Sequence, residues 1–201
     1  MTSSESEIYF DSVVSHSLTE LRVAYEVRNN GLGAVGLFNR IQSMKLDGTA
    51  SYAVANTYIN FEDGVLDLSK MVLPIPEGLN MTARIAPFIT YLQAGDSYQE
   101  EFRLMLPIEV CQPMRRVSLA MSAPGAEVVA NVPAQAKIVK VSVGMFRSKA
   151  DWQFTAVSPA HPGVYRVWPP GPPVDTQIIL TKTFQLSTPI AVLDYGIVGP
   201  V

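Results

Sequence analysis

Few side chains in this chain of 201 residues could exchange protons or act as nucleophiles near neutral pH, because it has two histidines and one cysteine. His161 lies in a turn between Ser158 and Gly163, and a general base needs a placed partner that a loop histidine usually lacks. His16 lies between two serines at a strand junction. Cys111 could form a nucleophile pair with a histidine only if the fold brings the two together. A lone cysteine is more often a small buried hydrophobic residue. The pattern predicts no catalytic residue and leaves open whether the protein is an enzyme.

The sequence also lacks a convincing set of metal ligands. A mononuclear copper site in a β-sandwich needs two histidines, a cysteine and usually a methionine. No histidine follows Cys111 until His161, which is too far along the chain for the short ligand loop of such sites. We therefore expect no metal and no cofactor.

One carboxylate stands at a position where it would be costly. Glu100 shares its parity with Tyr98 and Phe102, which would place it on the buried face of a strand, whereas Glu101 would face water. A buried carboxylate without a partner is expensive, so an inward Glu100 would be worth testing as a functional group. The pattern favours a simpler alternative, in which a β-bulge turns Glu100 outward.

The strongest candidate for a ligand site is a proline-framed stretch rich in aromatic residues. Aromatic side chains on stiff loops give contact area at low entropic cost, which binding surfaces exploit. The competing interpretation, in which both tryptophans plug the end of the fold, is favoured because large aromatic residues usually serve cores. The candidate residues are Trp152, Phe154, His161, Tyr165, Arg166 and Trp168.

The elements that would position these residues are strands. Glu20–Arg28 sets the apolar Leu21, Val23, Tyr25 and Val27 against the polar Glu20, Arg22, Glu26 and Arg28, which predicts a strand with one buried face. Asp63-Gly64 predicts a two-residue turn in a hairpin over Asn56–Val72, with Glu62 opposite Val65, Phe61 opposite Leu66 and Ile59 opposite Leu68. Ala94-Gly95-Asp96-Ser97 predicts a second, central hairpin between the runs Ile85–Leu92 and Tyr98–Ile108.

Other short apolar runs complete an all-β pattern with almost no helix. Pro169–Pro173 is expected to be a stiff surface loop. The further strands that we expect are Ile8–Val14 at an edge, Ala34–Ile41, Val117–Met121, Glu127–Val132, Lys137–Arg147, Trp152–Val157, Val164–Trp168, Gln177–Leu186 and Ile190–Tyr195.

About a dozen short strands separated by turns predict an antiparallel β-sandwich. The strand layout over residues 15–110 resembles an immunoglobulin-like sandwich, and that resemblance implies binding or assembly. We expect a mobile tail over residues 1–7 and a single domain over 8–201, with two small β units over 8–112 and 117–201 as the alternative.

Composition indicates that part of the surface is covered. Hydrophobic residues make up 48% and charged residues 16%, whereas ordinary domains carry roughly 25% charged residues. A partner, a second copy or a ligand would cover the excess apolar surface.

The net charge of −3 gives no reason to bind nucleic acid. No apolar run is long enough for a membrane span. The absence of a signal peptide and the single cysteine favour the cytoplasm, unless an export signal has been removed.

Together these patterns predict a non-enzymatic interaction or assembly module that binds a protein partner, or a second copy in a dimer, through an apolar surface. The alternative is a small β-fold enzyme of the cyclase or isomerase type, or a carrier, with an aromatic-lined cavity for an apolar small molecule.

Overall fold

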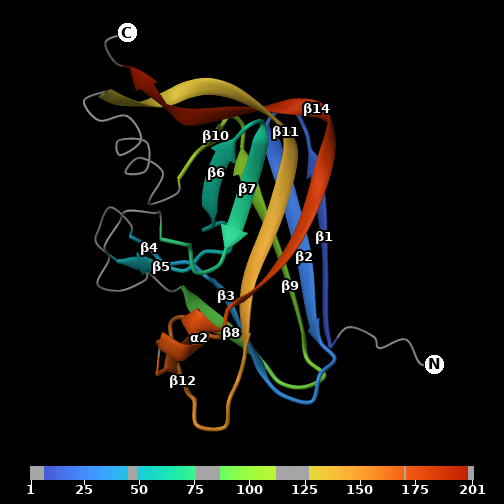
Figure 1. The fold of residues 1–201 in the computed structure, drawn as a ribbon, viewed down its shortest axis with the longest axis vertical. Helices are drawn as coiled ribbons and strands as arrows, with labels where there is room; N and C mark the ends of the chain where they lie inside the picture. The colour runs from blue at the N-terminus through green and yellow to red at the C-terminus, as the bar shows by residue number, and fades with distance from the viewer. Residues whose placement is uncertain (1–6, 45–48, 76–86, 112–126, 170, 199–201) are drawn as a thin grey trace, which may run out of the picture.

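The computed structural model describes residues 7–44, 49–75, 87–111, 127–169 and 171–198. Nearly all regular structure in them is β, which confirms the all-β prediction (Figure 1). The strands are β1 Ile8–His16, β2 Glu20–Asn29, β3 Val35–Arg40, β4 Ser43–Met44, β5 Ala50–Ser51, β6 Tyr58–Glu62, β7 Val65–Lys70, β8 Phe88–Leu92, β9 Ser97–Met105, β10 Ile108–Glu109, β11 Glu127–Arg147, β12 Gln153–Ala156, β13 Tyr165–Trp168 and β14 Ile178–Val198, with one short helix, α2 Gly171–Asp175.

The smaller sheet is antiparallel, in the order β1-β2-β9, and its register is regular throughout. Alternate residues of β2 are buried, from Leu21 to Val27, as the sequence pattern predicts. Strand β1 is an edge strand of this sheet, also as expected. Residues 1–6 of the expected tail lie outside the described residues, and the Glu7 carbonyl accepts a hydrogen bond from Asn30 N at 2.8 Å.

The larger sheet is organised around two strands of 21 residues each, β11 and β14, which pair antiparallel along nearly their whole length. On its other edge β11 pairs in parallel with β7 and then antiparallel with β3. The path through this sheet is β10-β14-β11-β3-β8-β13-β12, and β6 joins it through β7. The β7–β11 and β10–β14 pairs are parallel, so the sheet is mostly but not wholly antiparallel.

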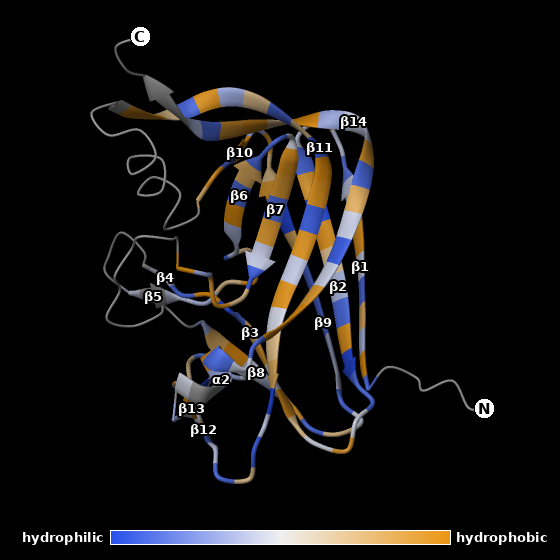
Figure 2. Cartoon of the chain, in the orientation of Figure 1, coloured by the Kyte–Doolittle hydropathy of each residue, from blue (hydrophilic) through white to orange (hydrophobic). Residues whose placement is uncertain are grey.

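The two sheets pack face to face, with the main core between them. Figure 2 shows the alternation of hydrophobic and hydrophilic residues along β11 and β14. The core joins Leu21, Val23 and Phe102 of the smaller sheet to residues of the larger one, among them Leu66, Leu68, Val139, Val141 and Val143. A second apolar cluster, around Phe38 and Phe146, lies at the end of the larger sheet that carries β12 and β13.

The Asp63-Gly64 turn and its register are confirmed. Asp63 has φ of 50° and Gly64 φ of 79°, the positive values that this two-residue turn needs. Strand β6 pairs with β7 through Glu62↔Val65, Phe61↔Leu66 and Ile59↔Leu68. Apolar residues therefore meet apolar partners, as the buried face requires.

The expected central hairpin is wrong, because β8 and β9 belong to different sheets. Residues 93–96 form an arch between the sheets, and the end of β2 holds this arch. Asn29 N donates to Asp96 O at 2.9 Å, Gly95 N donates to Asn29 O at 2.8 Å, and Asn29 Nδ2 donates to Gln93 O at 2.9 Å. Alternation along a strand shows which face is buried but not which strand lies beside it.

Several predicted short strands are parts of longer ones. Glu127–Val132 and Lys137–Arg147 both belong to β11, and Gln177–Leu186 and Ile190–Tyr195 fall almost wholly within β14. Register shifts between Val129 and Val132 and between Ala136 and Ile138 let the strands continue past nearby prolines.

Two other predictions, a strand over Val117–Met121 and a loop over Pro169–Pro173, were not confirmed. Val117–Met121 lies outside the described residues. The expected proline-rich loop overlaps α2, which begins at Gly171, because proline is tolerated in the first turn of a helix.

Candidate functional site

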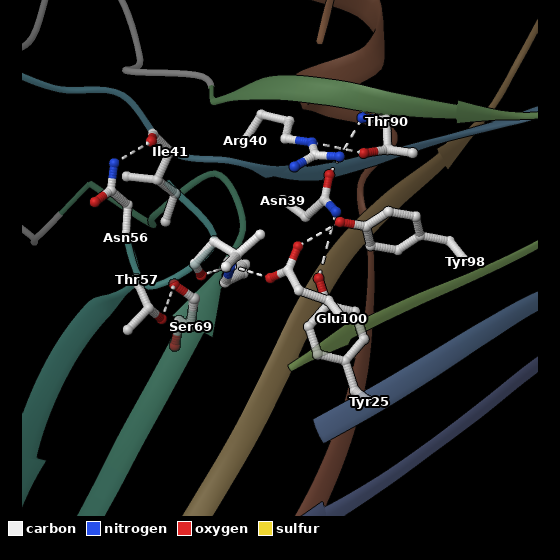
Figure 3. A network of polar contacts seen from close by, with 12 residues as sticks. Tyr25, Asn39, Arg40, Ile41, Asn56, Thr57, Ser69, Thr90, Tyr98 and Glu100 are labelled. Carbon is white, nitrogen blue, oxygen red and sulfur yellow. Dashed lines mark hydrogen bonds and ion pairs between the residues drawn. The ribbon is translucent and has the colours of Figure 1, made fainter. Parts of the chain in front are cut away.

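A cluster of polar side chains lies between the two sheets, and we call it the buried polar cluster (Figure 3). Lys70 ends β7, and Glu100 lies in the middle of β9, so the two come from opposite sheets. The Lys70 ammonium contacts Glu100 Oε1, and the two side chains are 2% and 1% exposed. The remaining members are Tyr25, Asn39, Arg40, Thr90 and Tyr98.

Strand geometry explains how charged residues reach this position. Lys70 has the same parity as the buried Leu66 and Leu68, and Glu100 has the same parity as the buried Phe102. The register between β2 and β9 continues without a shift through Tyr25↔Glu100. The bulge that was expected to turn Glu100 outward is therefore absent, and Glu100 points into the core.

Both carboxylate oxygens of Glu100 have partners. Oε1 accepts from Lys70 Nζ, and Oε2 accepts from the Tyr98 hydroxyl at 2.5 Å. Lys70 Nζ also donates to the carbonyl of Val54 at 2.6 Å, and lies 4.9 Å from the ring centre of Phe102. The ion pair is thus held in place from both of its ends.

Further hydrogen bonds connect the residues around the pair. Asn39 Nδ2 donates to the Tyr25 hydroxyl at 3.3 Å, and Thr90 N donates to Asn39 Oδ1 at 3.2 Å. Arg40 Nε donates to Thr90 Oγ1 at 2.9 Å, and its guanidinium lies 5.3 Å from the ring centre of Tyr98. These contacts fix the two tyrosines beside Glu100.

Burial shifts the acid–base behaviour of the cluster. Desolvation lowers the pKa of Lys70, and the Glu100 carboxylate opposes that shift. Desolvation, followed by the nearby Glu100 charge, raises the pKa of Tyr98 and of Tyr25 above the ordinary tyrosine value. Within the cluster the lysine therefore loses its proton more easily than usual, and the tyrosines keep theirs.

A second feature is an apolar groove at one end of the sandwich, which we call the end groove. Its volume is about 310 Å³, and it lies where the β1–β2 turn, the segment after β9 and the bend of β14 meet. Leu18 at its rim is 97% exposed, and the nearby Met105 is also exposed. Its lining residues are His16, Ser17, Leu18, Leu106, Pro107, Thr188, Pro189, Ile190 and Ala191.

The paired segments 127–136 of β11 and 190–198 of β14 extend from this groove, and we call them the ribbon. They run across the end of the sandwich at the top of Figure 1. Strand β7 pairs with β11 only from Ile138 onward, and β10 pairs only with Val192 and Leu193 of β14. Among the described strands, the outer edge of β11 over residues 127–136 has no neighbour. No residue from Val128 to Ala136 is charged.

A third feature, a groove of about 430 Å³, lies on the outer face of the smaller sheet, where Asp11, Glu26 and Glu101 line it. Each of these acids already has a basic partner: Lys182 for Asp11, Arg28 for Glu26 and Arg22 for Glu101. Exposed pairs of this kind contribute little energy and provide no unpaired group for a ligand.

The six candidate ligand-binding residues separate into two groups. Trp152 is buried against Phe146, with ring centres 5.4 Å apart, and Phe154 and Tyr165 pack against the same second cluster. The others lie nearer the surface: His161 is 4.7 Å from the ring centre of Tyr52, Arg166 lies over Phe88, and Trp168 is 63% exposed.

Three other observations limit the chemistry. Cys111 is an exposed residue, whereas a lone cysteine is more often buried, and its partly buried thiol donates to the Thr57 carbonyl at 3.4 Å. The described residues contain no group of three or more His, Cys, Asp or Glu side chains that could hold a metal ion. In the same part of the chain, no helix is long and apolar enough to cross a membrane.

Comparison with protein-family models, with curated proteins and with solved structures found no match for this chain. Its function is therefore inferred from the geometry described above.

Proposed function

We propose that the protein is an assembly module that forms a dimer by pairing its ribbon with that of a second copy. The observation that carries this proposal is the unpaired outer edge of β11 over residues 127–136. Such an edge presents backbone donors and acceptors to another strand, with interruptions at the register shift after Val129 and at Pro133, which has no N–H. Charge is one of the devices by which natural proteins protect exposed edges, and no residue from Val128 to Ala136 is charged.

The ribbon is long enough to hold two copies together. Ten residues of β11 span about 33 Å at roughly 3.3 Å per residue. Pairing through an edge joins the backbones, and the exposed apolar residue Val132 adds burial. A second copy fits better than an unrelated partner, because the ribbon and the end groove adjoin at Ile190 and Ala191. A two-fold axis would place the ribbon of each copy beside the groove of the other.

The same proposal accounts for the low charge of the chain and for its architecture. An apolar ribbon edge and an apolar groove would both be covered in the dimer, which explains part of the charge shortage. As part of this proposal, residues 15–110 form an immunoglobulin-like sandwich that serves as a scaffold for binding. The proposal also includes a cytoplasmic location.

Light scattering coupled to size-exclusion chromatography tests it. We expect twice the chain mass of 21.9 kDa at micromolar concentration. Val132→Lys should give monomers, because a lysine on a strand edge blocks pairing with a second strand. Leu18→Asp should weaken the dimer by placing a charge at the groove rim.

The matched control is Ile179→Lys, which changes an exposed apolar residue at the opposite end of β14. It should leave the dimer intact. A wild-type monomer would refute the proposal, and a dimer lost in Ile179→Lys but kept in Val132→Lys would place the interface elsewhere. Far-UV circular dichroism of each variant establishes that loss of the dimer is not loss of the fold.

A further inference from the structure

The contact between Lys70 and Glu100 brings an amine and a carboxyl group together under unusual conditions. Both side chains are almost completely buried, and each is oriented by another group: Val54 O for the amine and the Tyr98 hydroxyl for the carboxylate. Water that normally separates and solvates such ions is excluded from the position. Holding two reactants in contact in a dry site is the condition under which a bimolecular step becomes effectively unimolecular.

We propose that Lys70 and Glu100 condense into an amide bond, which joins Lys70 Nζ to Glu100 Cδ and releases one water molecule. The bond would connect β7 of the larger sheet to β9 of the smaller one. The proposal does not depend on the dimer.

The reaction balances without any added reagent. A proton passes from the Lys70 ammonium to the Glu100 carboxylate, which leaves a neutral amine and a neutral acid. The Nζ lone pair then attacks Cδ, and a C–N bond forms as the carbonyl π pair moves onto oxygen. The tetrahedral intermediate collapses with loss of one C–O bond. The second nitrogen proton leaves with that hydroxyl as water.

The neighbours favour each stage. Desolvation, which lowers the pKa of Lys70, favours the neutral amine that must attack. The Tyr98 hydroxyl donates to Oε2, where negative charge develops in the intermediate, and its raised pKa keeps it protonated as a donor. The Val54 carbonyl accepts a hydrogen bond from Nζ and so orients the nitrogen.

The product removes an energetic cost that the ion pair carries. Two charges taken out of water are expensive, even when they are paired, and an amide has none. The amide can keep the hydrogen bonds, since its N–H can donate to Val54 O and its oxygen can accept from Tyr98.

Intact-mass spectrometry of the purified, denatured protein tests the proposal directly. We expect a mass below that of the sequence by one water molecule. Trypsin should fail to cleave after Lys70, and digestion should yield a branched peptide that contains Lys70 and Glu100. Lys70→Arg and Glu100→Ala should show their full sequence masses.

A nearby ion pair provides the matched control. Lys140 and Asp67 are 2.7 Å apart but partly exposed, so water competes for both, and no bond is expected there. Lys140→Ala should therefore keep the loss of one water molecule.

Two results would overturn the proposal. One is a wild-type mass equal to that of the sequence, with normal cleavage after Lys70, which leaves the contact as an ion pair only. The other is a water loss that maps to Asp63-Gly64 or persists in Glu100→Ala, because an Asp-Gly pair can dehydrate by cyclising on its own backbone. The test does not depend on whether the variants fold, because the mass and the peptide map of the wild-type protein show whether the amide is present.

Discussion

Lys70 and Glu100 occupy inward positions on strands of opposite sheets, and neither has another charge of opposite sign among the contacts described for it. Each therefore depends on the other, whether the contact is ionic or covalent. The loss of one partner leaves a buried polar group that water cannot reach, which costs far more than the loss of an exposed pair.

We expect Glu100→Ala to lower the free energy of unfolding by roughly 3–5 kcal/mol, as measured by urea denaturation. Adding Lys70→Met should restore much of that loss, because the buried amine is then removed. Glu101→Ala is the control one residue away: its side chain is exposed and paired with Arg22, so about 0–1 kcal/mol is expected. A double variant no more stable than Glu100→Ala would show that the cost arises elsewhere.

The raised pKa of Tyr98 has a consequence at alkaline pH. Below the ordinary tyrosine pKa of 10.0, folded and unfolded chains both keep the phenol proton. Above it the unfolded chain ionises while the folded chain does not, so stability falls as pH rises towards the folded pKa. Tyr25 acts in the same direction.

Tyr98→Phe should therefore show a shallower loss of stability above pH 10 than the wild type, measured by urea unfolding at pH values on both sides of 10. As a free amine, Lys70 has a lowered pKa and acts in the opposite direction, so the two proteins are compared only when intact mass shows the same state of Lys70 in both. Parallel curves for the two proteins would contradict the expectation.

The sequence pattern raises one residue of this pair as a candidate, but it favours the wrong orientation for that residue. The parity of Glu100 with Tyr98 and Phe102 indicated an inward carboxylate, although the pattern favoured a bulge. Lys70 has the same parity as Leu66 and Leu68, so the pattern also indicates an inward lysine. Two inward charges of opposite sign on different strands indicate a pair, but only the packing of the sheets shows that they meet.

At the scale of elements, local chemistry was predictable and pairing was not. Asp63-Gly64 determined both the turn and the register, because adjacent strands joined by two residues have little choice of partner. Ala94-Gly95-Asp96-Ser97 is equally suited to a hairpin, but hydrogen bonds from Asn29 Nδ2 to the carbonyls of Leu92 and Gln93 hold the segment as an arch between the sheets. That interaction spans over sixty residues and leaves no local pattern.

The hairpin gives a direct test of this local control. Gly64→Val should destabilise the fold by about 1 kcal/mol or more, because a β-branched residue resists positive φ. Thermal or urea unfolding measures the change. Gly33→Val is the matched control, since its Cβ would meet nothing within 4 Å and its φ is not positive. Equal stability of the two variants would contradict the claim that positive φ at Gly64 sets the turn.

At the scale of the whole molecule, the composition indicates that some apolar surface is covered. The ribbon and the end groove are apolar surfaces that a second copy could cover. An interface built on backbone pairing and apolar burial should not weaken with salt. We expect the dimer to persist in high sodium chloride and to strengthen in sodium sulfate, measured by light scattering at decreasing protein concentration. Dissociation in sodium chloride would indicate an interface held by ion pairs.

The position of β11 also has a consequence for synthesis on the ribosome. Strand β6 pairs with β7, and β3 pairs with β8, yet in the described sheet only β11 joins these two units to each other and to β14. β11 begins at Glu127, so most of the chain has emerged before the sheet can close. During that interval β3 and β7 each expose an edge, and such edges invite pairing between nascent chains. Slower translation of the last third of the chain would lengthen this exposure, so yield of folded protein should depend on how fast β11 and β14 are delivered.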